Sequence, residues 1–174
     1  MRDRHKYARV EWERRFLLER LPLEVNVTRV RRIVDRYIAG TNLRLRQQSD
    51  EANGAIFKLT QKLPIDATGA RQGLITTIYL TGDEFQLLAK LPANLLTKAR
   101  YSVPPFGIDV FEDALAGLVL AEAEFDSAEE ASDLSPSPFI VREVTDDPRF
   151  TGGALVRASR RELEELLAEF GIRL

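Results

Sequence analysis

The chain has 174 residues, 44% of them apolar and 30% charged, which is enough to bury the core of one soluble globular domain. Its 25 Lys and Arg and 27 Asp and Glu give a net charge of -2, which argues against bulk attraction to nucleic acid or to a membrane surface. It has no cysteine and one histidine, His5, which excludes disulfides and thiolate sites and disfavours a Ser-His-Asp triad or a multi-histidine zinc site.

The first half of the chain is rich in strand patterns. Residues 43–48 and 55–62 alternate apolar and polar side chains on either side of a turn at 49–54, which predicts a β-hairpin. For residues 23–32 the pattern does not decide between a turn and a strand. Residues 64–73 are predicted to be a loop. Strands are predicted at 7–18, 33–38, 43–48, 55–62 and 74–80.

Three capping-box patterns, each a Ser or Thr followed three residues later by Glu, predict three helix starts. The first opens a helix at Thr81 that stops before Pro92. The second opens a short helix at Ser127, and the third opens an amphipathic helix at Ser159 that Gly171 ends. Further strands are predicted at 95–103, 106–113 and 117–126, and an extended segment at 139–144.

Short strands separated by turn signals predict an α+β protein of mainly antiparallel β structure, either a sheet or a barrel, with a few flanking helices outside it. No internal repeat or shift in composition marks a second domain. We predict a single domain over residues 1–174, with a core at about 7–157 and a C-terminal helix at about 160–170. No apolar run approaches a membrane span and the charged N-terminus lacks the apolar core of a signal peptide, so we expect a cytoplasmic protein.

Five of the predicted strands carry polar or charged side chains at alternating positions, and the charges form two acidic pairs and three basic strands. Because side chains at i and i+2 share one face of a strand, each set projects from one side, while the opposite side is mostly apolar. The sets are Glu11, Glu13 and Arg15; Arg44 and Arg46; Lys58, Thr60 and Lys62; Lys98, Arg100 and Ser102; and Glu122 and Glu124.

Two explanations fit these charged faces. Each face could be the solvent-exposed side of an amphipathic sheet, which is the usual reason for such alternation. Alternatively, helices packed on an apolar exterior would turn the charged faces toward the interior of a barrel. A charged interior is costly unless charge of the opposite sign compensates it, and a polyanion with divalent cations would supply that compensation.

The motifs, taken in order, resemble those of the CYTH superfamily, also called triphosphate tunnel metalloenzymes. The similarity runs over about residues 7–157. Residues 11–15 (Glu-Trp-Glu-Arg-Arg) resemble the Glu-x-Glu-x-Lys signature, 44–46 the Arg-x-Arg strand, 60–62 the Thr-x-Lys strand, 120–125 the late Glu-x-Glu strand and 143–150 the closing Glu-Val-Thr segment.

The resemblance implies an eight-stranded, closed antiparallel β-barrel forming a tunnel, in which a triphosphate is bound and, in many members, cleaved with a divalent metal. The metal ligands would be Glu11, Glu13, Glu122 and Glu124, whose carboxylate oxygens suit Mg²⁺ or Mn²⁺. The catalytic residues would be Glu13, Glu122 and Lys62. The triphosphate-binding residues would be Arg15, Arg44, Arg46, Lys58, Lys62, Lys98 and Arg100.

The chain departs from the family pattern in two places. Arg15 stands where the signature has lysine, and these two cations are not interchangeable at a shaped site. The strand before the first helix, residues 76–81, carries no charge, whereas the family often places an Arg- and Glu-rich segment there. Asp109 is either an additional acidic group in the tunnel or an exposed strand residue.

The predicted function is divalent-metal-dependent hydrolysis of inorganic triphosphate or of a small organic triphosphate. One alternative is an adenylyl cyclase that makes cyclic AMP from ATP, which would need an adenine pocket at a tunnel mouth. Another is a non-catalytic polyphosphate- or phosphate-compound-binding module, which the uncharged strand and Arg15 favour. We expect no membrane or nucleic-acid partner, because the basic residues Arg29, Arg31, Arg32 and Arg36 have no exposed aromatic residues between them and fit a surface face.

Overall fold

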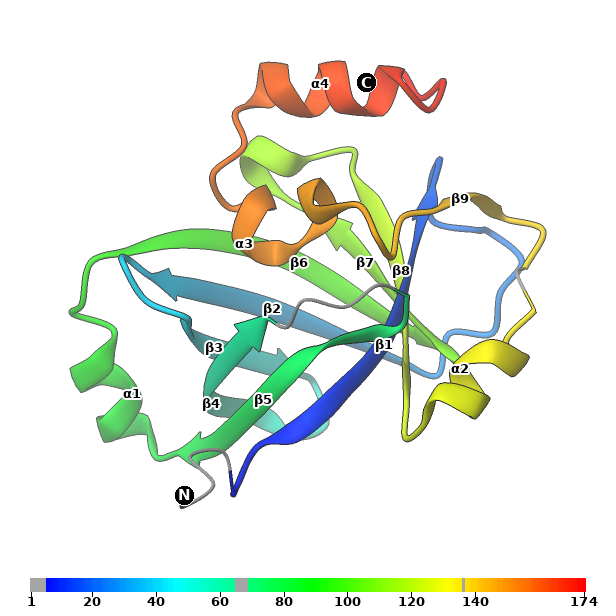
Figure 1. Ribbon diagram of the computed structural model, residues 1–174. Coiled ribbons are helices and arrows are strands. Elements are labelled where there is room, and N and C mark those ends of the chain that lie inside the picture. The colour runs from blue at the N-terminus through cyan, green and yellow to red at the C-terminus, as the bar shows by residue number, and fades with distance from the viewer. Residues whose placement is uncertain (1–5, 65–68, 136) are drawn as a thin grey trace.

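The strands form one antiparallel sheet that closes on itself as a barrel (Figure 1). The computed structural model describes residues 6–64, 69–135 and 137–174, so His5 and part of the predicted 64–73 loop lie outside the described residues. Within the described ranges, eight strands follow one another around the barrel as β5-β4-β3-β2-β6-β7-β8-β1, and β1 pairs with β5 to close it. The predicted closed barrel is confirmed.

The strand bounds explain how the barrel is assembled. β3 and β4 form the predicted hairpin, with Leu43 opposite Gln61 and Asp50 opposite Gly54. β9 lies outside the barrel and pairs with the end of β1. The strands are β1 (Arg9–Leu18), β2 (Arg29–Ile38), β3 (Leu43–Asp50), β4 (Gly54–Pro64), β5 (Arg71–Leu80), β6 (Ala93–Val103), β7 (Phe106–Phe111), β8 (Val119–Phe125) and β9 (Ile140–Glu143).

Short-range capping chemistry sets the helix starts. Thr81 and Glu84 form the predicted capping box, as do Ser159 and Glu162, and Gly171 follows the last helix with a positive φ of 79°. No helix in the described part of the chain is long and apolar enough to cross a membrane. The helices of the described residues are α1 (Gly82–Leu88), α2 (Ala128–Asp133), α3 (Gly152–Leu155) and α4 (Arg160–Ala168), with 3-10 turns at η1 (Asp113–Leu115) and η2 (Pro148–Phe150).

Apolar residues on the outer face of the barrel are covered by helices and connecting segments. Phe85 of α1 packs on Leu45 and on Phe57, and the ring centroids of Phe85 and Phe57 lie 4.5 Å apart. On the side of β1 and β8, Phe16 and Phe139 belong to a second apolar cluster. Glu13, Arg15, Arg46 and Lys98 are buried, so the alternating charged faces point into the barrel and the solvent-face explanation does not hold.

One end of the barrel is closed by apolar side chains. Leu17 and Leu120 reach this end from the barrel strands and meet Phe150 and Leu155, and beyond them the inner face of α4. Figure 1 shows α3 between the barrel and α4. The segment after β9 therefore serves as a plug, and the charged site lies within the barrel next to it.

For residues 23–32 the sequence pattern does not decide between turn and strand, and pairing with β6 makes them strand from Arg29 onward. Two predicted boundaries are wrong in detail: β5 begins at Arg71, because pairing with β4 and β1 extends it, and β7 ends at Phe111 instead of residue 113. At α2, Ser127 accepts from the Glu130 amide, but the Glu130 carboxylate accepts from the Asp126 amide, so the capping box is incomplete. α3 and η2 are elements that the sequence patterns miss.

Truncating the inner face of α4 should cost much more stability than truncating an exposed leucine. Leu163 is 0% exposed in the plug, whereas Leu87 on α1 is 67% exposed. We expect Leu163→Ala to lower the free energy of unfolding by about 2–5 kcal/mol. Leu87→Ala should change it by less than about 0.5 kcal/mol. Urea denaturation of the two variants measures both values, and equal losses would show that α4 does not contribute to the folded core.

Candidate active site

The strand register brings the predicted charged residues to a common interior. On the β1–β8 pair, Glu13 lies opposite Glu124 and Arg15 lies opposite Glu122. On the β3–β4 pair, Arg46 lies opposite Lys58. Opposed residues in an antiparallel pair project from the same face of the sheet. The acidic pairs and the basic strands therefore share one inner surface.

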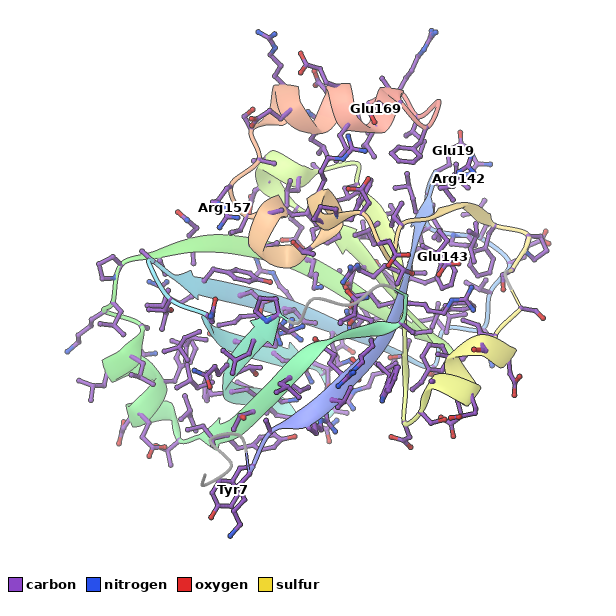
Figure 2. The ribbon with its side chains drawn as sticks, viewed as in Figure 1. Tyr7, Glu19, Arg142, Glu143, Arg157 and Glu169 are labelled. Carbon is purple, nitrogen blue, oxygen red and sulfur yellow. The ribbon has the colours of Figure 1, made fainter. Side chains whose placement is uncertain are left out.

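A cavity of about 530 Å³ opens within the barrel beside the plug. Its walls include the β2–β3 turn, the end of β4, the start of β5 and the segment Phe150–Arg157; Figure 2 shows Arg157 beside α3. Lys58 is outside the described lining, and its Nζ lies 5.1 Å from the ring centroid of Tyr79. Ten of the eleven predicted site residues line the cavity: Glu11, Glu13, Arg15, Arg44, Arg46, Lys62, Lys98, Arg100, Glu122 and Glu124.

The two central carboxylates have different electrostatic surroundings. Burial, reinforced by the neighbouring carboxylate of Glu122, raises the pKa of Glu13 to about 7. Burial also opposes ionisation of Glu122, but Lys98 and Arg100 outweigh it and lower the pKa of Glu122. Glu122 is thus compensated by protein cations, whereas Glu13 lies in a place where additional positive charge would be favourable.

Asp109 of β7 holds the two basic residues of β6, Lys98 and Arg100. It is 0% exposed, so the alternative of an exposed strand residue is wrong. Arg100 donates from Nε and Nη2 to the two oxygens of Asp109 at 2.6 Å each, and Lys98 pairs with the same carboxylate. Arg100 also pairs with Glu122. Gly107 makes room for this guanidinium, because a Cβ there would lie 3.2 Å from Cδ of Arg100.

Arg15 uses the donors that distinguish it from lysine. Its Nη1 donates to Glu13 at 3.0 Å, and its Nη2 donates to the Gln72 side chain at 2.8 Å and to the Thr145 carbonyl at 2.7 Å. A lysine ammonium has three donors at one nitrogen and could not span this fork. Arg15 therefore joins β1 to β5 and to the segment after β9.

Sequence reasoning missed two polar residues of this interior, Asp35 and Gln72. Asp35 is 1% exposed on β2 and pairs with Arg46, and Gln72 holds Arg15. The available signal for Asp35 was weak, because it is a lone acid in an arginine-rich stretch. Asp35 and Tyr37 are two residues apart and therefore project from the same face of β2, but only the closed barrel shows that this face is the inner one.

The donor chemistry of the lining fits a divalent cation that is bound together with phosphate. Glu11 and Glu13 from β1 and Glu122 and Glu124 from β8 supply carboxylate oxygens on neighbouring strands. Among the described residues, no three acidic or histidine side chains lie together as a ready-made metal cluster. Mg²⁺ typically takes one or two carboxylates and completes its shell with water and substrate phosphates, so a preassembled cluster is not required.

Comparisons with known proteins identify the family to which this barrel belongs. No protein-family model matches the chain. Over 119 residues it is 31% identical to the inorganic triphosphatase of Nitrosomonas europaea, an alignment that spans 65% of this chain and 73% of that protein. The chain belongs to the family of this inorganic triphosphatase.

Solved structures support the family assignment. The crystal structure of the inorganic triphosphatase NE1496 matches with a TM-score of 0.55 and 25% identity, covering 85% of this chain and 95% of that one. A crystal structure described as the hypothetical protein NE1496 matches with a TM-score of 0.56 and 28% identity, covering 86% and 99%. The family likeness therefore extends over the barrel as well as the aligned sequence.

Proposed function

We propose that this member of the inorganic triphosphatase family hydrolyses inorganic triphosphate or a small organic triphosphate inside its barrel, as a metal-dependent enzyme of the CYTH superfamily. The observation that carries the proposal is the gathering of ten predicted site residues around one cavity. The kinship with a named inorganic triphosphatase supports the reaction type.

The charge of the lining suits a polyanion. The ten predicted residues comprise six cations and four carboxylates, which is an excess of positive charge in a partly buried space. Arginine grips phosphate oxygens through its planar fork, and lysine acts as a compact point charge. Arg44, Arg46 and Arg100 would hold the phosphate chain, and Lys98 would neutralise the charge beside Glu122.

The carboxylates Glu11, Glu13, Glu122 and Glu124 would hold Mg²⁺ or Mn²⁺ at the acidic side of the cavity. A bound ion of this kind supplies a polarised phosphoryl oxygen and a water of lowered pKa. The chain's own groups then have two tasks, which are to orient the phosphates and to neutralise developing charge. Lys62, whose Nζ lies 2.7 Å from Glu11, is placed to stabilise negative charge at this side of the site.

A phosphate-release panel tests the proposal. Purified protein should release phosphate from inorganic triphosphate, thiamine triphosphate or ATP in the presence of Mg²⁺ or Mn²⁺, and excess EDTA should remove the activity because the carboxylates would lack their cation. Restoring the metal ion should restore the rate, which is the control against denaturation. Cyclic AMP and pyrophosphate from ATP would instead identify a cyclase. Tight triphosphate binding by calorimetry without turnover would identify a binding module, and inertness toward every triphosphate would contradict the proposal.

A further inference from the structure

Asp35 is a buried carboxylate that contacts the basic residues of the cavity without lining it. Arg46 donates from Nε and Nη2 to its two oxygens at 2.6 and 2.7 Å. Nε of Arg44 lies 3.7 Å from one of the same oxygens. Arg44 and Arg46 line the cavity, whereas Asp35 is absent from the described lining. The carboxylate therefore holds both arginines from the side of the barrel wall.

The barrel uses the same arrangement on another strand pair. Arg44 and Arg46 are two residues apart on β3, and Asp35 faces Arg46 from β2. Lys98 and Arg100 are two residues apart on β6, and Asp109 faces Arg100 from β7. In each case one fully buried aspartate on a neighbouring strand pairs with two inward cations that share a face.

The pairing leaves part of each guanidinium available to an anion. Arg46 spends Nε and one hydrogen of Nη2 on Asp35, so its remaining donors can face the cavity. Arg44 approaches Asp35 through Nε, which is buried at 3.7 Å from the carboxylate and forms no hydrogen bond among the described residues, so Asp35 occupies none of its Nη donors. A flexible arginine would lose rotamer entropy on gripping phosphate, and a carboxylate that fixes it beforehand reduces that cost.

We propose that Asp35 is a positioning residue for triphosphate binding, which fixes the Arg44–Arg46 pair in the orientation that grips the phosphate chain. The inference rests on the proposed triphosphatase function. Burial opposes ionisation of Asp35, but Arg46 and Arg44 outweigh it and lower its pKa, so the carboxylate stays charged at neutral pH.

The variant Asp35→Asn tests the proposal, because it keeps the shape of the side chain and removes its charge. Hydrogen bonds to charged groups contribute about 1.5–3 kcal/mol, so we expect KM for inorganic triphosphate to rise roughly 10- to 100-fold, with a smaller change in kcat. Calorimetry with inorganic triphosphate and no metal should show the same loss of affinity. A lowered Tm with unchanged KM and unchanged affinity would overturn the proposal, because a merely structural ion pair would behave that way.

Asp50→Asn is the matched control. Asp50 lies on β3 and pairs with Arg29 on β2, so it joins the same two strands, but neither residue lines the cavity. This variant should lower Tm without moving KM. If Asp35→Asn fails to fold, Asp35→Glu keeps the charge and displaces the carboxylate by one methylene; positioning predicts a raised KM for it, and a wild-type KM would overturn the proposal.

The two proposals fail in different ways. Wild-type protein that binds inorganic triphosphate but releases no phosphate would remove the triphosphatase function, while the metal-free binding comparison of wild type with Asp35→Asn would still decide the role of Asp35. Wild-type protein that binds no triphosphate would overturn both.

Discussion

Replacing Glu13 with glutamine is expected to reduce triphosphate hydrolysis by at least about 100-fold, since changes to outer-shell partners of a metal site already cost about 10- to 100-fold. Glu13 lines the cavity and is 6% exposed, and it contacts Arg15 and lies near Glu122. Glutamine keeps the shape but removes the charge that would bind the cation. The measurement is kcat/KM for inorganic triphosphate at saturating Mg²⁺ or Mn²⁺.

Stability distinguishes this loss from unfolding. Glu13 is buried beside a second carboxylate, and removing one of two neighbouring like charges relieves repulsion, so Tm should not fall. Glu19→Gln is the control, because Glu19 is exposed just beyond the end of β1 (Figure 2) and should leave both kcat/KM and Tm unchanged. A Glu13→Gln variant with a rate within twofold of wild type would show that Glu13 takes no part in the reaction.

Replacing Arg100 with methionine is expected to give the largest loss of stability among single changes in the barrel interior, about 3–5 kcal/mol, because it leaves buried carboxylates without their partner. Arg100 pairs with Asp109 and with Glu122, and both pairs lie inside the barrel. Phosphate release should be lost as well, since Arg100 lines the cavity. Urea denaturation measures the change in the free energy of unfolding.

Arg149 provides a comparison with the same connectivity at the surface. It pairs with Asp147 at 2.8 Å and with Glu169 at 2.9 Å, so it also joins two carboxylates. Solvent screens these exposed pairs, and Arg149→Met should cost less than about 1 kcal/mol. Similar losses for Arg100→Met and Arg149→Met would mean that burial does not govern the strength of the interior network.

Some features of this fold could be predicted because they depend on neighbours close in sequence. The alternation of Glu11, Glu13 and Arg15 defined the inner face of β1, and the hairpin of β3 and β4 followed from two alternating runs around a turn. The reciprocal bonds of Ser159 and Glu162 are separated by one helical turn. The same kind of pattern wrongly predicted a complete capping box at Ser127, because the Glu130 carboxylate accepts from the Asp126 amide instead of the Ser127 amide.

The closeness of the site residues could be expected from the motifs, but their partners could not. Lys58 has the same alternating pattern as Lys62, yet it lies against Tyr79 and outside the cavity lining. Asp109 could equally have been exposed, and its burial followed only from the pairing of β7 with β6 and β8. The plug around Phe150 and Leu155 carries no strong local signal, because its short helix is stabilised by contacts with the barrel end and α4.

The sequence by itself determined which side chains share a face, since strand and helix periods are properties of the local backbone. Closure of the barrel gave the sheet an inner and an outer face, and only the tertiary structure decided that the charged faces form the inner one. Tertiary structure also decided what each charge contacts. Arg15 donates to Glu13, two residues away, and to the Thr145 carbonyl, 130 residues away. The second contact can form only when the whole chain has folded.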